Sequence, residues 1–379
     1  MTSGNRLFTL CLLLCSFVTV GRFFGQQAAK EKSFFELGTV IKADGGTFNV
    51  NAIPCVSVTP GGKLITVWTA PYGGPHSKMR ILGALSPDGG RTWSTPFTLI
   101  DNPGKEDADP NVVIDEKRIL VLSTTLPVPG KILTTEIWMT ASEDEGKTWC
   151  KPVLTTHPHK YNEGKVHVGY KLKDGRLAVG YAWEIFCERG LSPATEGEMD
   201  NRSGLMFSSD GGVHWTAGGD IYARPPKVAP WAVNGMDEPA TVVLENGEIF
   251  ALLRNGTTRL YQSRSKDNGA SWSVPVPSPL TSLNAPAALW RLRSRKDVVV
   301  VWDNSPQNRW PLAAAISEDN CSTWSKPKVI VDPGMQVSYP SVTQVADGTI
   351  VAVWQQQLPQ NKGREIRLAR FNRAWLLSH

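Results

Sequence analysis

The stretch Ser86-Pro87-Asp88-Gly89-Gly90-Arg91-Thr92-Trp93 decides the fold, because the chain repeats its pattern. Four later segments place Ser, Asp and Trp at the same offsets: Ser142–Trp149, Ser208–Trp215, Ser265–Trp272 and Ser317–Trp324. The first serines of the five copies lie 56, 66, 57 and 52 residues apart. Self-similarity at such a period predicts a repeat architecture.

Each copy is predicted to be a turn between two strands. Asp can accept hydrogen bonds from backbone N–H groups further along the turn, and Gly adopts positive φ without a Cβ clash. The residue before Trp and the Trp itself then begin the next strand, and the indole is expected to pack over the turn. We therefore interpret the five Asp residues as structural rather than catalytic. In the fifth copy, Cys321 stands where the first copy has Gly90.

A second periodic signal precedes each copy. Short apolar runs flank turn-like tetrapeptides, several with Asp-Gly or Asn-Gly, and this pattern predicts buried β-hairpins. The six turns lie at residues 60–63, 115–118, 173–176, 245–248, 294–297 and 346–349. Six hairpins and five Asp-containing turns predict an all-β fold, a six-bladed β-propeller of four-stranded antiparallel blades. We expect residues 34–48 to supply a strand that closes the ring. Two packed β-sandwich domains are the alternative architecture, but no linker separates two halves.

The N-terminus is typical of a secretory signal peptide. Arg6 precedes an apolar run over residues 7–20, and small residues follow. The run is short for a membrane span, although a retained anchor is the alternative. We predict a signal peptide over residues 1–27 and the propeller over 28–379. The expected product is a monomeric protein, secreted or periplasmic, without membrane insertion after cleavage.

Composition and cysteine spacing exclude several other functions. The net charge of +5 is dispersed along 379 residues and does not predict nucleic-acid binding. Cys55, Cys150, Cys187 and Cys321 follow the signal, too few for a disulfide framework and spaced unlike a zinc motif. One disulfide among them is conceivable. We expect no metal and no cofactor.

The motif Ser-x-Asp-x-Gly-x-Thr-Trp resembles the Asp-box (BNR) repeats of the sialidase superfamily over about residues 34–375. The resemblance implies that the site lies where the innermost strand of each blade begins. A recurring proline marks five of those starts, at Pro54, Pro110, Pro239, Pro286 and Pro340. In the third unit the segment Lys165–Val168 has the same place without proline. Six segments would thus converge on one pocket.

Glu238 and Tyr339 are the predicted catalytic pair, each directly before one of these prolines. A carboxylate can accept the proton of a phenol and make its oxygen a nucleophile. Sialidase-like enzymes use Tyr in this way, as exceptions to the two-carboxylate scheme. Arg254 resembles one arginine of the cluster that binds the substrate carboxylate in the family, a task that suits the planar guanidinium.

The chain also departs from the family pattern. Ala52 stands where the family has Arg before Ile-Pro, and Arg309 is a possible substitute for the third cluster arginine. The acid Asp expected after Trp68 is missing, so His76 is the nearest titratable candidate, with Asp109 and Asp303 as alternative acids. These departures place strict sialic-acid specificity in doubt.

A long loop after Trp183 and Glu184 extends the third unit toward the predicted pocket. Trp183 could stack on a sugar, or could be a core residue at a strand end. We assign both residues, with Arg254, Arg309 and Asp303, to substrate binding.

Three functions are compatible with these residues. The first is a secreted exo-glycosidase that hydrolyses terminal, possibly acidic, sugars from glycans. The second is a non-catalytic carbohydrate-binding propeller, and the third is a polysaccharide lyase with Tyr339 or His76 as acid and base. The expected partner in every case is a carbohydrate. We favour the glycosidase, in part by analogy with the family.

Overall fold

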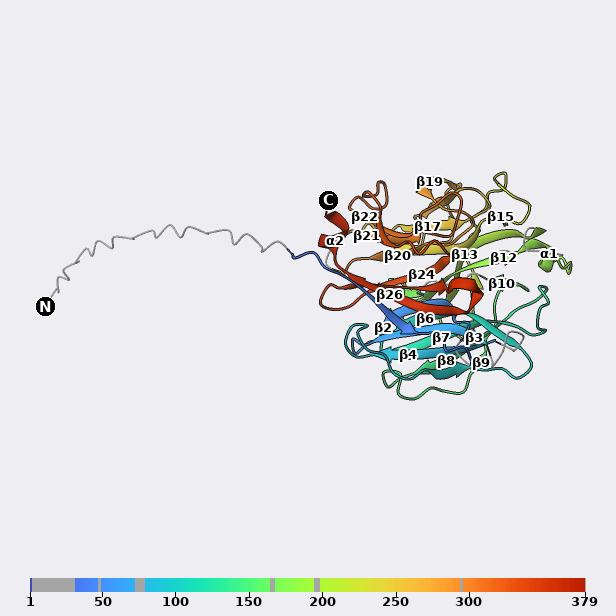
Figure 1. Cartoon of the computed structure of the whole chain (residues 1–379), viewed down its shortest axis with the longest axis horizontal. Coiled ribbons are helices and arrows are strands. Elements are labelled where there is room, and N and C mark those ends of the chain that lie inside the picture. The colour runs from blue at the N-terminus through green and yellow to red at the C-terminus, as the bar shows by residue number, and fades with distance from the viewer. Residues whose placement is uncertain are drawn as a thin grey trace. The chain divides into compact units, whose positions relative to one another are not determined.

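The computed structural model describes Met1 and residues 31–46, 49–71, 79–163, 168–193, 198–293 and 296–378. The chain divides into the segment Met1–Lys32 and a compact unit, Ser33–His379, which holds all the strands described below. That unit contains six sheets in chain order, antiparallel except for one short parallel pair in the third, so the predicted six-bladed all-β propeller is confirmed (Figure 1).

The blades follow one another along the chain, and each begins with its innermost strand. Blade 1 contains β2 (Ala52–Val58), β3 (Leu64–Pro71), β4 (Met79–Ser86) and β5 (Phe97–Ile100). Blade 2 contains β6 (Glu106–Asp115), β7 (Arg118–Leu126), β8 (Glu136–Ser142) and β9 (Val153–Leu154). Blade 3 contains β10 (Asn162–Glu163) and β11 (Tyr170–Lys171), which both pair with β12 (Leu177–Glu184), and then β13 (Asp200–Ser208) and β14 (Thr216–Ala217). The short strand β15 (Asn234–Gly235) pairs in parallel with β13.

The second half repeats the same order. Blade 4 contains β16 (Asp237–Val243), β17 (Ile249–Arg254), β18 (Arg259–Ser265) and β19 (Val276–Thr281). Blade 5 contains β20 (Ala288–Arg291), β21 (Val298–Asp303), β22 (Leu312–Ser317) and β23 (Lys328–Val331). Blade 6 contains β24 (Val337–Gln344), β25 (Ile350–Gln357), β26 (Arg364–Phe371) and β1 (Phe35–Ile41). The described helices are short: α1 (Ile185–Glu188), the 3-10 turn η2 (Pro359–Asn361) and α2 (Arg373–Leu377).

The ring is closed by the N-terminal strand of the propeller. β1 pairs antiparallel with β26 and becomes the outermost strand of blade 6, as Figure 1 shows for the blue and red strands. Phe35 also stacks on Trp375 of α2, with ring centroids 4.7 Å apart. The predicted closing strand is therefore confirmed, and it joins the two ends of the propeller without a covalent link.

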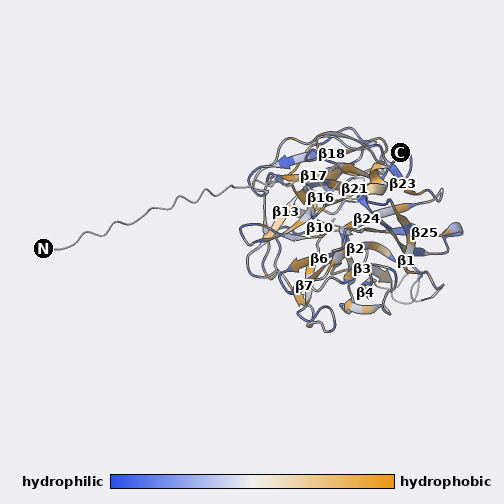
Figure 2. Cartoon of the chain, turned by 90° about the vertical axis from the view of Figure 1, so that its left-hand side faces the viewer, coloured by the Kyte–Doolittle hydropathy of each residue, from blue (hydrophilic) through white to orange (hydrophobic). Residues whose placement is uncertain are grey.

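Apolar residues fill the spaces between neighbouring blades. Because other blades cover both faces of a central strand, its residues need not alternate in hydropathy. In β21, for example, every residue from Val298 to Asp303 is buried. One core joins blades 5 and 6 through Val301 and Trp354, and another joins blades 6 and 1 through Val353 and Trp68. Figure 2 shows the hydrophobic strands around the centre, where β2, β6, β10, β16 and β24 meet.

The five Asp boxes have the predicted turn structure. In the first, the Ser86 hydroxyl donates to Asp88 Oδ1 at 2.9 Å and accepts from the Gly90 amide at 2.8 Å. The Thr92 hydroxyl donates to Asp88 Oδ2 at 2.7 Å. Each box tryptophan packs into the core between its own blade and the preceding one: Trp93, Trp149, Trp215, Trp272 and Trp324. A box therefore locks a hairpin and attaches its blade to the neighbour.

The four described cysteines are all free. Cys55, Cys187 and Cys321 are buried and Cys150 is exposed. The disulfide that the sequence left open is therefore absent among the described residues. Within the same residues, no helix is long and apolar enough to cross a membrane.

Candidate functional site

A strained backbone position opens the innermost strand in four of the blades. Ile53, Asp109, Glu238 and Tyr339 all have positive φ, between 39° and 55°, and each directly precedes a proline. Each also lies in a shift of register, where the innermost strand bulges away from its neighbour. Bulges turn side chains out of the alternating pattern, and non-glycine residues with positive φ are concentrated at functional sites. The recurring proline of the sequence therefore marks a repeated bulge at one end of the central channel.

Glu238 and Arg254 form a buried ion pair in blade 4. Arg254 Nη1 lies 2.9 Å from Glu238 Oε2 and 3.6 Å from Asp237 Oδ2. Arg254 Nε donates to Asn284 Oδ1 at 3.2 Å, across the boundary to blade 5. Burial alone would lower the pKa of Arg254, but the charge of Glu238, that of Tyr339 once it is ionised, and that of Asp237 raise it well above its ordinary value. This guanidinium therefore remains charged inside the protein.

Tyr339 reaches the same place from blade 6. The residue is partly exposed, but protein atoms surround its hydroxyl, so burial raises the pKa well above its ordinary value. The Glu238 charge raises the pKa further, and Arg254 and Arg309 lower it. The Arg309 guanidinium carbon lies 5.7 Å from the centre of the Tyr339 ring, and its Nη2 donates to the Asn284 carbonyl. The structure thus brings Glu238, Arg254, Arg309 and Tyr339 together.

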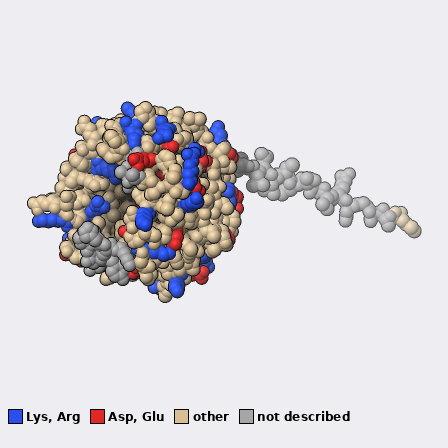
Figure 3. All heavy atoms as spheres, turned by 90° about the vertical axis from the view of Figure 1, so that its right-hand side faces the viewer, with Lys and Arg blue, Asp and Glu red and all other residues tan. Residues whose placement is uncertain are grey.

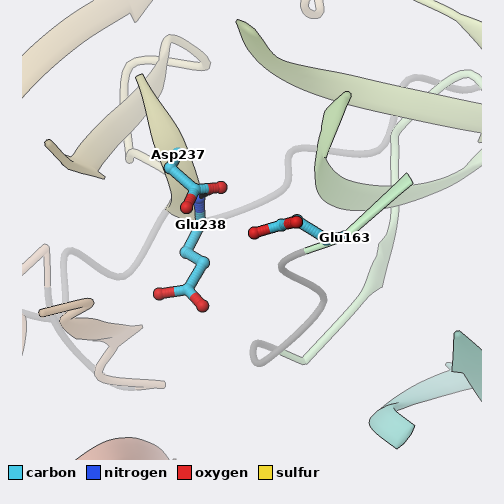
Figure 4. A group of neighbouring side chains, drawn as sticks. All are labelled: Glu163, Asp237 and Glu238. Carbon is cyan, nitrogen blue, oxygen red and sulfur yellow. Dashed lines mark hydrogen bonds between the residues drawn. The ribbon is translucent and has the colours of Figure 1, made fainter. Parts of the chain in front are cut away.

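Further carboxylates surround this group. Glu163 of β10 points toward Asp237 and Glu238 (Figure 4), and one oxygen of each lies within 4.8 Å of the other two. Burial, together with the charges of Glu163, Asp109 and Asp237, raises the pKa of Tyr161 well above its ordinary value. The same Asp109 charge also raises the pKa of Tyr339. Oxygen ligands of this kind suit hard cations, but Arg254 already neutralises part of the cluster.

Asp109 and Asp303 differ in their access to the pocket. Asp109 occupies the bulge of blade 2, is half-buried, and donates its amide to Thr69 Oγ1 at 3.2 Å. Asp303 ends β21 and is fully buried, and neither of its carboxylate oxygens accepts a hydrogen bond. Burial raises its pKa well above the ordinary value, and only the nearby Arg309 charge opposes this. Asp109 is therefore the better placed of the two to contact a ligand.

Trp183 and Glu184 make contacts within blade 3. Both Glu184 oxygens accept backbone amides, from Cys187 at 2.7 Å and from Asp200 at 2.8 Å, and the residue is fully buried. The carboxylate therefore caps α1 and anchors β13, a role that its sequence context did not reveal. Trp183 stacks on His159 with ring centroids 4.2 Å apart, and its Nε1 donates to Asp220 at 2.9 Å. One face of the indole is thus already covered by protein.

Further expectations concern blades 1 and 3. His76 lies outside the described residues, as does most of Lys165–Val168 in blade 3. Ala52 is buried in β2 and pairs with Thr69, and its side chain offers no hydrogen-bond donor to the pocket. The amide of the next residue, Ile53, donates to Gln355 Oε1 of blade 6 at 2.9 Å. The guanidinium of the family pattern therefore has no counterpart at this position.

The bulges share one face of the propeller. It is the side that carries α1, β10 and β15, and Figure 3 shows it hollowed near the centre, with acidic and basic side chains close to the hollow. A cavity of about 470 Å³ opens elsewhere in the channel, lined by Val58, Ile114, Thr241, Trp290 and Val342 among others. Those residues belong to the C-terminal parts of the innermost strands, away from the bulges. We therefore assign the candidate site to the bulge end, where the charged side chains converge.

Comparison with known proteins agrees with this fold. Residues 62–352 match the family model of the BNR repeat-like domain. The chain belongs to this family. It is a BNR-repeat propeller of the sialidase superfamily.

Relatives of this BNR propeller include curated sialidases. One from Micromonospora viridifaciens is 26% identical over 374 residues, covering 86% of this chain and 52% of the relative. One from Bacteroides fragilis is 21% identical over 361 residues, covering 83% of this chain and 62% of the relative. The chain thus spans between half and two thirds of the length of these relatives. Among solved structures, the intramolecular trans-sialidase of Ruminococcus gnavus superposes with a TM-score of 0.68 at 16% identity, covering 90% of this chain and 98% of that one.

Sequence reasoning missed three residues of the site. Asp237 and Asn284 stand beside the positions that were chosen, but only the fold shows that both bind Arg254. Glu163 follows no proline and lies in an interrupted innermost strand, so the repeat gave no reason to select it. A search for carboxylates at the start of each innermost strand would have found Asp237 and Glu163.

Proposed function

We propose that this protein is a glycoside hydrolase that removes a terminal sugar from a glycan, with Tyr339 as nucleophile and Glu238 as its base. The observation that carries the proposal is the convergence of a phenol, a carboxylate and a guanidinium from blades 4 and 6. Because the pKa of Tyr339 is raised, its hydroxyl keeps its proton at neutral pH and needs a base in order to attack. Glu238 is the charge that acts most strongly on it.

The chemistry follows from these positions. Tyr339 Oη attacks the anomeric carbon while Glu238 accepts the phenolic proton, and the bond to the leaving oxygen breaks as an acid protonates that oxygen. Water then attacks the anomeric carbon and gives one proton to the deprotonated acid, while the bond to Tyr339 Oη breaks and Glu238 returns the phenolic proton. The sugar leaves with retained configuration. Asp109, at the bulge of blade 2, is our candidate for the acid. His76 is the alternative.

The role of Arg254 in this scheme is to hold Glu238. Its Nη1 contacts both Glu238 and Asp237, so it fixes the base beside the phenol. Arg309 lies against the Tyr339 ring and would stabilise the developing phenolate. Trp183 is proposed to shape the rim on the blade 3 side.

We also propose that the protein acts outside the cytoplasm, as a monomer on carbohydrate substrates. Its place outside the cytoplasm is inferred from residues 1–27, whose basic start and apolar run are typical of an export signal.

A non-catalytic carbohydrate-binding role is the second candidate. The observation that favours it is Ala52, because the family position for a guanidinium holds a methyl group. Such a protein would bind glycans through the same residues without releasing a reducing sugar.

Replacement of Tyr339 by Phe tests the hydrolase directly, because it removes only the hydroxyl. With aryl glycosides as substrates, we expect kcat to fall at least about 100-fold, with an unchanged melting temperature. Tyr170→Phe is the matched control, since that hydroxyl contacts Thr241 away from the bulges. Wild-type kcat in Tyr339→Phe would remove Tyr339 from the mechanism, and absence of turnover by the wild type would favour the binding protein.

A further inference from the structure

We propose that Asn284 is a substrate-binding residue, whose side-chain amide donates a hydrogen bond to one hydroxyl group of the terminal sugar. The proposal rests on the proposed function, because it concerns the same pocket. It gives Asn284 a part in selecting the sugar, which is separate from the catalytic roles of Tyr339 and Glu238.

Asn284 precedes the innermost strand of blade 5 in the strained conformation that recurs at the pocket. Its φ is 47°, within the range spanned by Asp109, Glu238 and Tyr339. In this blade the proline, Pro286, follows two residues later rather than directly. Asn is one of the few residue types that adopt such a φ with any frequency. The repeated conformation therefore adds blade 5 to the blades that contribute to the bulge end.

Two oxygen atoms of Asn284 hold the two guanidinium groups of the pocket. Arg254 Nε donates to Asn284 Oδ1 at 3.2 Å, and Arg309 Nη2 donates to its backbone carbonyl. The Val233 amide also donates to Oδ1, at 3.4 Å. These contacts fix the plane of the side-chain amide. They also identify its oxygen, because the amide nitrogen in that place would face two N–H donors.

The amide nitrogen is the end of the Asn284 side chain that remains available. Among the described residues Nδ2 has no acceptor, and the atom is not enclosed by protein. The residue as a whole is only 4% exposed, so Nδ2 is a fixed donor that keeps contact with solvent. A sugar hydroxyl group accepts such a hydrogen bond, and a donor that is already oriented loses little freedom on binding.

The competing explanation is that Asn284 only positions the two arginines. That role needs the oxygen atoms of Asn284 and makes no use of Nδ2. A site that donates a hydrogen bond to a hydroxyl group discriminates against the sugar that lacks this group. The two explanations therefore predict different results when the hydroxyl groups of the sugar are removed one at a time.

The experiment measures binding, so it does not depend on turnover. The first probes are methyl α- and β-glycosides of galactose, glucose, mannose, fucose, N-acetylglucosamine and N-acetylneuraminic acid. The monodeoxy and deoxyfluoro derivatives of the tightest-binding glycoside follow. All are titrated by NMR into the full chain that carries Tyr339→Phe. We expect the loss of one particular hydroxyl group to weaken binding at least about fivefold.

Asn284→Gly, added to this chain, removes the side chain, and Gly adopts positive φ without strain. We expect the fivefold loss for that one hydroxyl group to fall below about twofold, while discrimination at the other hydroxyl groups persists. Equal weakening of every sugar, with discrimination retained at every position, would show that Asn284 only positions Arg254. That result would overturn the proposal.

Asn284→Asp keeps an acceptor for Arg254 Nε and the Val233 amide but replaces the donor with a second acceptor. Fluorine cannot donate a hydrogen bond to that acceptor. The affinity of the deoxyfluoro sugar relative to its parent should therefore fall at least about fivefold in this variant. Asn268→Asp is the matched control, the same exchange at an exposed residue with φ of 56° in an Asp box, and should leave this ratio unchanged. An unchanged ratio in Asn284→Asp as well would contradict the proposal.

Cleavage assays on the wild type separate this proposal from the proposed function. If a glycoside binds and is not cleaved, the proposed hydrolase fails, and the binding comparison still decides the role of Asn284. If the wild type cleaves it and Asn284→Gly keeps the full discrimination, the hydrolase stands and the role of Asn284 is excluded. Failure of every probe to bind would also overturn the proposal.

Discussion

Single residues at the bulges combine backbone strain with chemical function. Glu238 and Tyr339 hold φ values of 39° and 55°, which L-residues rarely adopt and which cost on the order of 1 kcal/mol or more each. The following proline fixes the next φ and removes an amide donor at the point where pairing is interrupted. The surrounding blades must therefore stabilise these conformations, and the strained residues project toward a common pocket.

Asp303 allows a test of burial at the residue scale. Burial raises the pKa of its carboxyl well above the ordinary value of about 3.9. The folded protein therefore keeps a proton that the unfolded chain releases, and stability falls as pH rises above about 4. Asp303→Asn preserves the shape and removes this titration, so its melting temperature should exceed that of the wild type by a margin that grows from pH 4 to pH 8.

The exposed Asp332 offers the control for this pH series. Asp332→Asn should change the melting temperature only slightly, because the side chain is exposed. A constant difference for Asp303→Asn would mean that its carboxyl is ionised in the folded protein.

The sequence predicted some of these residues and not others for physical reasons. Glu238 and Tyr339 could be chosen because a local Pro motif repeats at equivalent places. The partners of Arg254 could not be predicted, because the contact between Arg254 and Asn284 depends on how blades 4 and 5 pack. Glu184 was assigned to the substrate from its place at a strand end, yet its oxygens bind two backbone amides. Such capping depends on the path of the loop between α1 and β13.

At the scale of elements, the Asp boxes explain why the blades were predictable. Each box closes a turn through contacts within a few residues, so its sequence is sufficient to identify it. Hydrogen bonds from the hydroxyl and amide of Thr148 lower the pKa of Asp144 to about 2, and those from Ser271 do the same for Asp267. These carboxylates stabilise the fold above about pH 4, and their contribution is lost as pH falls toward 2.

Removal of one box carboxylate should affect stability without affecting the site. Asp210 binds the Ser208 hydroxyl and the amides of Val213 and His214. We expect Asp210→Ala to lower the free energy of unfolding by about 1 kcal/mol and to leave KM unchanged, as measured by thermal melting and aryl-glycoside kinetics. A selective rise in KM with unchanged stability would contradict the structural role of the boxes.

At the scale of the whole molecule, the circular arrangement is what creates the site. Blades 2 to 6 supply Asp109, Glu163, Glu238, Asn284 and Tyr339, which are far apart in the sequence. The arrangement depends on β1, which pairs with β26 over most of its length and completes blade 6. Because β24 of the same blade carries Tyr339, closure of the ring and the position of the proposed nucleophile are linked.

Deletion of β1 tests this linkage. A chain lacking residues 1–41 should melt at least about 5 °C lower than the full chain, because the edge of β26 loses its partner and Trp375 loses the stacking of Phe35. A chain lacking only residues 1–32 keeps β1 and should melt like the full chain. Equal melting temperatures for all three chains would show that β1 does not hold the ring closed.

The most direct test of the central claim is to trap the glycosyl-enzyme. The full chain would be incubated with a fluorinated aryl glycoside of the sugar that it hydrolyses fastest, quenched, digested and analysed by peptide mass spectrometry. The account predicts that the peptide containing Tyr339 gains the mass of one fluoroglycosyl group and that Tyr339→Phe shows no adduct. An adduct on Glu238 or Asp109 instead, or turnover with inverted anomeric configuration and no adduct, would contradict it.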